Sequence, residues 1–238
     1  MFSKFVQCLL LVAAGLNCTL AYAGVTVERT RVIVHEGQRE TSLALVNQNA
    51  YPVLIQTWID NGDLDATPET ASAPIVPLPA VFRLEPQQQR TLRLVATAQP
   101  VAQDRESLYW LNVYEIPPRP DEGGDANSLR LTITLRTQLK VIYRPRKLSR
   151  EAEKAPMRMV VRADGHTVQL NNPTPFYITL AKAEICEGDR SIPLGATLLP
   201  PFSTQQQTVD GTLSNGAEFR FSWLDDDGNS QAARLPLW

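Results

Sequence analysis

Residues 128–145, SLRLTITLRTQLKVIYRP, carry a large apolar side chain on every second position, with one interruption at Thr137. A period of two is typical of a β-strand with one apolar and one polar face. The run is about three times the usual strand length of roughly 5–6 residues. It raises the question whether this whole apolar row is buried in the chain's own core. The apolar positions are Leu129, Leu131, Ile133, Leu135, Leu139, Val141 and Tyr143.

The segments on either side of this run also alternate between apolar and polar residues, and turn residues separate them. Runs of this kind at regular spacing indicate β-sandwiches, and no helix of ten or more residues is expected after residue 23. At residues 146–156 the sequence changes to RKLSREAEKAP, which has one large apolar residue and is typical of a linker. The sequence predicts an all-β protein with β-sandwich domains at 24–145 and 156–238, joined by a linker at 146–155.

Proline and glycine mark several connections between the predicted strands. Residues 67–86, TPETASAPIVPLPAVFRLEP, contain prolines that exclude a central strand and favour an ordered loop along a sheet edge. The stretch ADGH at 163–166 predicts a hairpin, and DDDG at 225–228 predicts another turn.

The first 23 residues have the features of a secretory signal peptide. Lys4 is the only charged residue before Glu28, an apolar segment follows, and Ala21-Tyr22-Ala23 supplies the small residues that signal peptidase recognises. Cleavage is expected after Ala23, and no later segment has the roughly 18 apolar residues of a membrane-spanning helix, so no membrane insertion is predicted. Once Lys4 is removed, the 25 acidic residues outnumber the basic ones, which argues against nucleic acid as a partner.

Residue types that usually carry catalysis are sparse. His35 and His166 both adjoin predicted turns, and the chain has no nucleophile motif, phosphate-binding loop or metal-ligand spacing. The run at 225–227 consists of three aspartates, but a solvated turn is commoner than a calcium site for such a run. Cys186 is the one cysteine after residue 23 and is expected to be a buried apolar group without a disulfide. The sequence predicts no enzyme, no cofactor and no metal.

Arg31 and Lys140 are two of the basic residues that lie within predicted strands. Arg31 stands in the first strand, in VERTRVIV, and Lys140 stands in the middle of the long strand. Most such residues lie on a solvated face. The alternative is that the first and last strands of one sandwich bring both cations to a single cleft, where they would hold a carboxylate by charge-assisted hydrogen bonds.

Residues 101–118, VAQDRESLYWLNVYEIPP, favour the second interpretation. This stretch resembles the diagnostic segment of the periplasmic pilus-assembly chaperones, the PapD-like family of the chaperone–usher pathway. The shared pattern is the DRESL start, an aromatic residue at Trp110, Asn112-Val113, and the closing Ile116-Pro117-Pro118. ERTRVIV at 28–34, FRLEP at 82–86 and KVIYRP at 140–145 also resemble the family, whereas the likeness beyond residue 145 is mainly architectural.

The resemblance implies two immunoglobulin-like domains in an L-shaped arrangement, located in the periplasm. It implies that the long strand is donated to pilus or fimbrial subunits, which then pass to an outer-membrane usher, and it leaves self-association of the free form open. The residues that it assigns are Leu131, Ile133 and Leu135 for apolar contacts with the subunit, Arg31 and Lys140 for the subunit's C-terminal carboxylate, and Glu106, Arg144 and Asp226 for a charged cluster between the domains. Asp225 or Asp227 is an alternative to Asp226.

The loop from Arg119 to Asn127 is short, and Cys186 has no disulfide partner, so the resemblance points to the short-loop branch of the family. Two other classes stay open on the sequence alone. One is a periplasmic β-sandwich that binds or hydrolyses carbohydrate, for which the sequence offers no acidic or aromatic site. The other is a pilus subunit itself, which would lack a strand, whereas this chain carries an overlong one.

Overall fold

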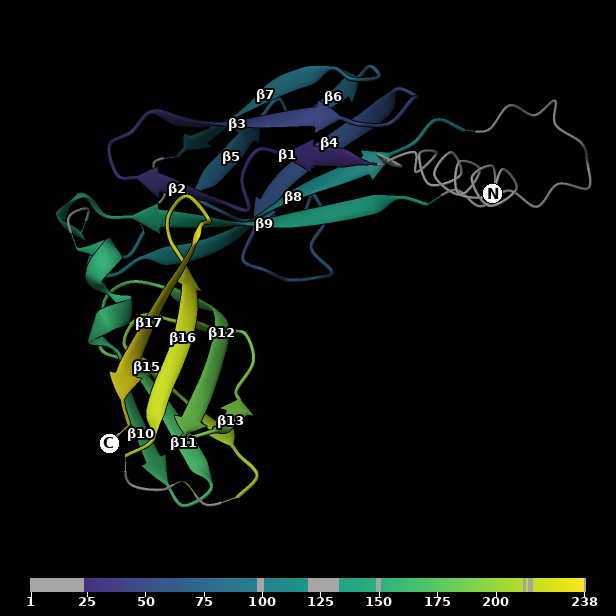
Figure 1. Cartoon of the computed structure of the whole chain (residues 1–238). Coiled ribbons are helices and arrows are strands. Elements are labelled where there is room, and N and C mark those ends of the chain that lie inside the picture. The colour runs from purple at the N-terminus through teal and green to yellow at the C-terminus, as the bar shows by residue number, and fades with distance from the viewer. Residues whose placement is uncertain are drawn as a thin grey trace, which may run out of the picture.

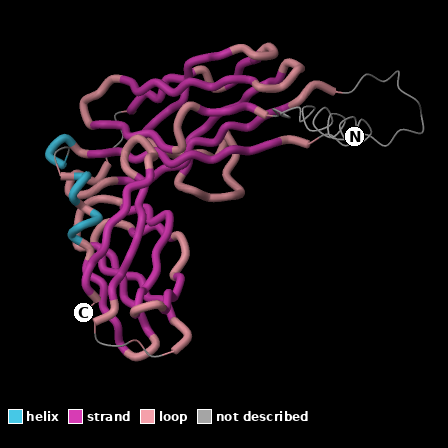
Figure 2. Tube along the Cα trace, viewed as in Figure 1, coloured by secondary structure: helices cyan, strands magenta, loops and turns pink. Residues whose placement is uncertain are grey.

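The computed structural model describes residues 24–97, 101–119, 133–148, 151–211, 213 and 216–237, and strands make up most of them (Figure 2). Three parts of the predictions lie outside the described residues: the signal peptide at 1–23, the loop at 120–127, and Leu131. No helix among the described residues is long and apolar enough to cross a membrane.

The first domain consists of two facing sheets, which confirms the predicted sandwich. One sheet has the strand order β1-β3-β7-β5, and the other has the order β2-β9-β8-β4-β6 (Figure 1). The strands are β1 (Val25–Val27), β2 (Arg31–His35), β3 (Glu40–Asn47), β4 (Val53–Asp60), β5 (Ile75–Leu78), β6 (Val81–Leu84), β7 (Gln89–Ala96), β8 (Ser107–Ile116) and β9 (Leu135–Arg144).

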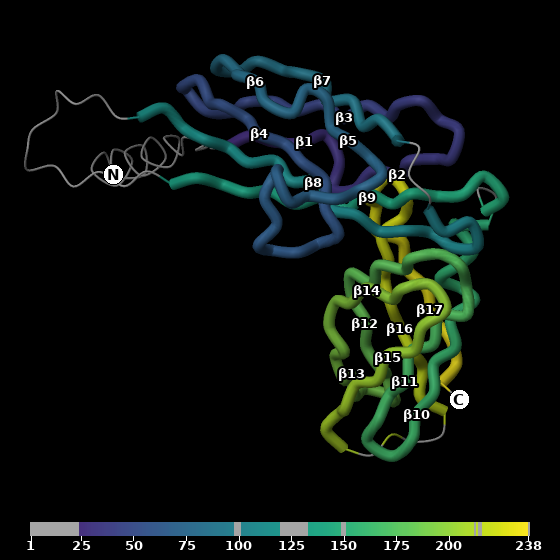
Figure 3. Tube along the Cα trace, turned by 180° about the vertical axis from the view of Figure 1, so that it is seen from behind, coloured from purple at the N-terminus to yellow at the C-terminus, as the bar shows by residue number. Residues whose placement is uncertain are grey.

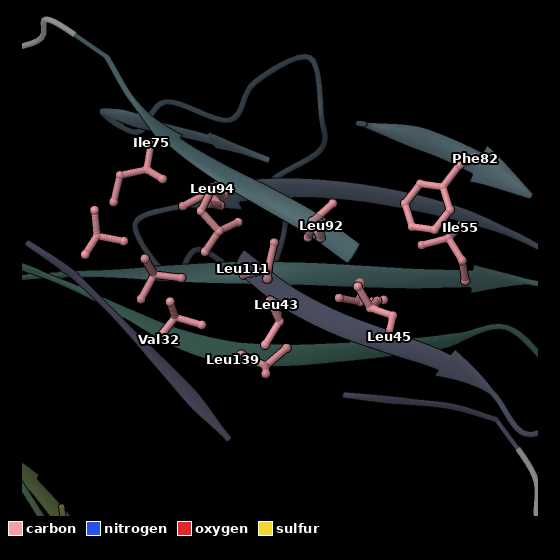
Figure 4. Packing of buried hydrophobic residues seen from close by; sticks show 14 of the residues in the cluster. Val32, Leu43, Leu45, Ile55, Ile75, Phe82, Leu92, Leu94, Leu111 and Leu139 are labelled. Carbon is pink, nitrogen blue, oxygen red and sulfur yellow. The ribbon is translucent and has the colours of Figure 1, made fainter. Parts of the chain in front are cut away.

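The core of this domain follows from the alternation in its strands. Leu43 and Leu45 of β3 face the same interior as Leu92 and Leu94 of β7, and Leu111 of β8 closes it from the opposite sheet (Figure 4). All five side chains are fully buried. Each such side chain contributes about 1.5–3 kcal/mol relative to an exposed position.

The first segment of the chain changes sheets, and this leaves part of β9 with a free edge. β1 pairs with β3, whereas β2 runs parallel to β9 with Arg31 opposite Lys140 and His35 opposite Arg144. β8 pairs with β9 from Leu135 onward. Within the described residues, no strand pairs with the other edge of β9 at 135–139.

The proline-rich stretch is more regular than the sequence predicts. Its second half forms β5 and β6, which are edge strands of the two opposite sheets, whereas residues 67–74 are without regular strand structure. Pro77 lies inside β5 opposite Leu94 of β7. An edge strand tolerates a residue without an N–H because only one of its sides needs backbone partners. The prediction of an edge position is therefore right, and the prediction of a loop is wrong for the residues of β5 and β6.

The second domain is a smaller sandwich with the strand orders β10-β11-β15 and β13-β12-β16-β17, and β14 pairs with β12. The hairpin at 163–166 joins β10 to β11, and the turn at 225–228 joins β16 to β17, as predicted. Cys186 is buried and free. The strands are β10 (Val160–Asp164), β11 (Thr167–Asn172), β12 (Ile178–Glu187), β13 (Arg190–Pro193), β14 (Thr197–Leu199), β15 (Ser203–Thr208), β16 (Glu218–Leu224) and β17 (Ser230–Pro236).

The segment between the sandwiches contains three short 3₁₀ turns: η1 (Arg146–Leu148), η2 (Ala152–Lys154) and η3 (Pro156–Arg158). Ala155 is buried in the core of the second domain, and Leu148 and Ala152 pack against that core. The segment is therefore a packed connector, because small alanine side chains fit against the sandwich even though only one large apolar residue is present. The two domains form an L, seen from both sides in Figures 1 and 3.

Candidate functional site

Arg31 and Lys140 lie side by side because β2 and β9 run parallel in this register. The buried Arg31 donates a hydrogen bond from Nη1 to the carbonyl oxygen of Leu224 in the second domain, at 3.1 Å. Its Nε has no hydrogen-bond partner within the described residues. The ammonium of Lys140 lies 5.6 Å from the centroid of the Trp110 ring. The structure thus places the two predicted cations together, and Arg31 contacts the second domain.

Burial makes both of these cations responsive to an anion. Desolvation lowers the pKa of Arg31, although the charges of Asp226, Asp225 and Glu106 oppose this effect. Desolvation also lowers the pKa of Lys140, and the charge of Arg31 lowers it further. Neither residue takes part in any of the ion pairs between described residues. A carboxylate bound to both would offset the cost of desolvating their charges and accept charge-assisted hydrogen bonds from them.

The apolar row of β9 continues past the core of its own domain. Leu139 and Val141 are buried in that core, as is Tyr143. Towards the start of the strand the same row becomes exposed, with Leu135 at 47% and Ile133 at 61% of their full accessible surface. Ile133 lies two residues before Leu135, where the part of β9 with an unpaired second edge begins. An exposed apolar edge of this kind is normally avoided in soluble domains, because it templates pairing with another chain.

A polar network that the sequence analysis missed supports β9 from its other face. The buried Asp60 accepts hydrogen bonds at Oδ2 from Trp58 Nε1 at 3.1 Å and from Asn112 Nδ2 at 2.7 Å. Arg136 of β9 donates from Nε to Asn112 Oδ1 at 2.8 Å, and its guanidinium lies 5.0 Å from the Trp58 ring centroid. The network ties β9 to β8 and β4 where the far edge is open. Asn112 lies in the segment at 101–118 that resembles the family, and Arg136 lies on the polar face of the predicted strand. The sequence therefore marked both residues, although not the contact between them.

Arg144 is held between two carboxylates from different parts of the chain. Its Nε donates to Glu106 Oε1 at 2.6 Å, and its Nη1 and Nη2 donate to Asp226 Oδ2 and Oδ1 at 2.6 and 2.8 Å. Burial disfavours the charged guanidinium, but the hydrogen bonds to Asp226 and the charges of both carboxylates raise the pKa of Arg144 above its ordinary value. The structure brings Asp226, rather than Asp225 or Asp227, to this position.

Glu106 also contacts the second domain through backbone groups. Its Oε2 accepts a hydrogen bond from the backbone N–H of Tyr177 at 2.7 Å, and its own N–H donates to the carbonyl oxygen of Pro175 at 2.9 Å. Asp226 lies in the turn between β16 and β17, which is also part of the second domain. The three charged residues therefore bridge the two domains, and a cleft of about 370 Å³ beside them is lined by Arg31, Arg144 and Asp226 among others.

The aspartate turn is stabilised by its own backbone. Asp225 Oδ1 accepts hydrogen bonds from the backbone N–H groups of Asp227 and Asn229, at 3.1 and 2.8 Å. This is the local bonding of a turn. Among the described residues, no three His, Cys, Asp or Glu side chains are arranged to hold a metal ion.

These observations define a class: two immunoglobulin-like sandwiches in an L, with an open-edged apolar strand that leads to a pair of cations, one buried and one partly buried. The family model for the N-terminal domain of PapD, a pili and flagellar-assembly chaperone, matches residues 24–149, and the model for the C-terminal domain of the PapD pili-assembly chaperone matches residues 154–235. The chain belongs to the PapD family of pilus-assembly chaperones.

Individual relatives agree with this assignment. The probable fimbrial chaperone YadV of Escherichia coli K12 is 31% identical over 87% of each chain. The crystal structure of the CupB2 chaperone of Pseudomonas aeruginosa is similar with a TM-score of 0.78 and 32% identity, over 90% of this chain and 100% of that one. The SafB chaperone of Salmonella enterica, solved in complex with the SafA pilin, is similar with a TM-score of 0.76 and 28% identity, over 92% of this chain and 99% of that one.

Proposed function

We propose that this chaperone binds fimbrial subunits by adding the open edge of β9 to them and by holding their C-terminal carboxylate between Arg31 and Lys140. The observation that carries the proposal is the alignment of these two features along one strand. The edge is unpaired at 135–139, and the cation pair stands at the next position, where β2 begins. Addition of a strand to an exposed sheet edge is a general mode of peptide recognition.

The proposal also implies a direction for the bound segment. β9 runs from its exposed apolar end toward Lys140. A subunit strand whose C-terminus lies at Lys140 must therefore run parallel to β9, in line with the parallel β2 that occupies the same edge beyond that point. At about 3.3 Å per residue, Leu135 lies about 17 Å from the anchor along the strand.

The anchor fixes which subunit side chains face the apolar row. A slip of one residue would turn every subunit side chain to the opposite face, so a single anchored end is sufficient to set the register. Full burial of Leu135 or Ile133 against a subunit stabilises the complex by about 1.5–3 kcal/mol for each side chain. Leu131, which continues the row by sequence, is proposed to contribute in the same way.

The cellular setting is part of the same proposal. Residues 1–23 have the pattern of a secretory signal, and the chaperone SfaE, which is described as periplasmic, is 28% identical with a TM-score of 0.69. We place this chain in the periplasm, where it receives subunits and passes them to an outer-membrane usher. Glu106, Arg144 and Asp226 have the role of orienting the two domains, and no contact with subunits is assigned to them.

The test uses a purified cognate subunit segment with either a free C-terminal carboxylate or a C-terminal amide. Wild-type chaperone is expected to bind the free acid at least tenfold more tightly than the amide, because the amide carries no charge for Arg31 and Lys140. Lys140→Met, which retains the aliphatic stem, is expected to lose most of that preference. Lys147→Met is the matched control, because Lys147 is exposed in η1.

Affinities are measured by fluorescence anisotropy at constant ionic strength, and circular dichroism verifies that each variant is folded. If Lys140→Met discriminates between acid and amide as strongly as Lys147→Met does, the anchor is wrong, and the strand edge alone would have to hold the subunit.

A further inference from the structure

A second buried polar site lies beside the first residue of β9, away from the cation pair at Lys140. Glu115, near the end of β8, is only 6% exposed. Its Oε1 accepts a hydrogen bond from Nδ2 of the buried Asn49 at 2.7 Å, and its Oε2 accepts one from the backbone N–H of Val25 at 2.8 Å. None of the ion pairs between described residues includes Glu115. A carboxylate buried this deeply is costly unless a cation accompanies it.

The residue that fills this site is Gly24. Its N–H donates to Asn49 Oδ1 at 2.9 Å, and its carbonyl oxygen accepts from the backbone N–H of Gln48 at 3.0 Å. A Cβ on Gly24 would lie 3.7 Å from Glu115 Oε2, so the carboxylate stands directly beside this residue. Gly24 is also buried, and its φ of +93° is one that residues with side chains rarely adopt.

Gly24 is the residue that follows the expected cleavage point after Ala23. Hydrolysis of that peptide bond adds the hydroxyl of water to the carbonyl carbon of Ala23 and the proton to the nitrogen of Gly24. At neutral pH the products are a carboxylate on the released segment and an α-ammonium on Gly24. The nitrogen therefore changes from a neutral group with one donor to a cation with three.

We propose that Asn49 and Glu115 form a binding site for the α-ammonium of the mature chain, so that removal of the signal segment supplies the missing counter-ion of Glu115. Asn49 Oδ1 already accepts from this nitrogen, and cleavage would give the same nitrogen two further donors in a site whose negative charge comes from the adjacent Glu115. Asn49 is fixed in turn, because its backbone N–H and its Nδ2 both donate to the buried Asn47.

The site lies against the beginning of the proposed donor strand. The same Cβ position on Gly24 is 3.7 Å from Cδ1 of Leu135, the first residue of β9. Processing therefore stabilises the end of the first domain from which the exposed apolar row begins, and it does so only after the segment has been removed. The proposal does not depend on the carboxylate anchor at Lys140, and the two can fail separately.

The test compares two chains, one beginning at Gly24 and one retaining Ala23, each with and without Glu115→Gln. The additional residue moves the ammonium outward by about 3.3 Å. When Glu115 is present, the retained Ala23 is expected to lower the folding equilibrium constant about tenfold, because it moves the ammonium away from its hydrogen-bonded partner. In the Glu115→Gln background, the same residue is expected to lower the constant less than twofold. The equilibrium constants come from urea unfolding followed by tryptophan fluorescence.

A second measurement does not depend on how well Glu115→Gln folds. The rate of acylation of the Gly24 α-amine at neutral pH is followed by mass spectrometry of the N-terminal peptide. A bound ammonium is expected to react at least tenfold more slowly in the folded chain than in the chain unfolded in urea. An equal cost of the extra residue in both backgrounds overturns the proposal, and so does an α-amine that reacts equally fast in folded and unfolded chains.

Discussion

Partial burial beside Arg31 and Trp110 changes the behaviour of Lys140, which would be an ordinary exposed cation elsewhere on a strand. Its pKa lies below the usual 10.5 because of desolvation and, secondarily, because of the charge of Arg31. In the free protein the folded state therefore holds this proton less tightly than the unfolded chain does. The contribution of Lys140 to stability thus rises with pH through its lowered pKa and towards 10.5.

The pH dependence of subunit binding is opposite to that of stability, because a carboxylate favours protonated Lys140. The affinity for the C-terminal subunit segment is expected to fall several-fold as the pH rises from 7.5 through the lowered pKa of Lys140. Lys140→Arg retains its charge in this range and is expected to bind with nearly constant affinity. Anisotropy titrations across this range test the prediction. Parallel pH profiles for wild type and Lys140→Arg would show that another group controls the binding.

At the scale of the strand, β9 combines two environments along a single alternating row. The buried half completes the core through Leu139 and Val141, whereas the half that includes Leu135 is exposed on an open edge. The periodic sequence predicts the strand and its two faces, because the alternation is a local property. It does not show where the core ends, since that depends on β2 leaving the edge at Arg31.

Other features also depend on contacts between distant parts of the chain, which a local sequence pattern does not predict. Asp60 is a turn-adjacent aspartate in the sequence, but its network with Asn112 and Arg136 requires three strands to be aligned. The 146–155 segment has a polar composition, yet Ala155 is buried against strands that come later in the chain. The proposed carboxylate-binding pair is predicted by family resemblance more than by spacing, because Arg31 and Lys140 are far apart in sequence.

Leu135→Ser tests the assignment of the exposed row. The free energy of unfolding is expected to change by less than about 0.5 kcal/mol, because the side chain is half exposed in the free protein. The subunit affinity is expected to fall about 10- to 100-fold, because 1.5–3 kcal/mol of burial is lost. Leu54→Ser is the matched control, since Leu54 of β4 has a similar exposure and lies two strands away. A large loss of stability with unchanged binding would mean that Leu135 belongs to its own core.

At the scale of the whole molecule, a few polar contacts determine how the two sandwiches meet. Glu106 and Arg144 come from the first domain, and Asp226 and the Leu224 carbonyl that Arg31 contacts come from the second. The orientation matters for the proposed function, because the second domain supplies part of the surroundings of Arg31. A change at this junction therefore affects both the angle between the domains and the anchor.

The two carboxylates of this cluster are expected to differ in importance because they differ in exposure. The side chain of Glu106 is 1% exposed and that of Arg144 is 4% exposed, whereas the side chain of Asp226 is 45% exposed. Glu106→Gln removes the charge opposite a buried guanidinium and is expected to reduce the free energy of unfolding by ~3 kcal/mol. Asp226→Asn is expected to cost less than ~1 kcal/mol, because solvent screens an exposed partner.

Asp226→Asn is expected to act instead on the arrangement of the domains, because it removes the bidentate bond that links the β16–β17 turn to Arg144. Small-angle X-ray scattering should show a broader distribution of interdomain distances than in the wild type. Asp227→Asn is the control, since the neighbouring Asp227 carries the same charge without contacting Arg144 in the described structure. If both variants scatter like the wild type, the packed connector at 146–158 holds the domains in place, and the charged cluster contributes stability alone.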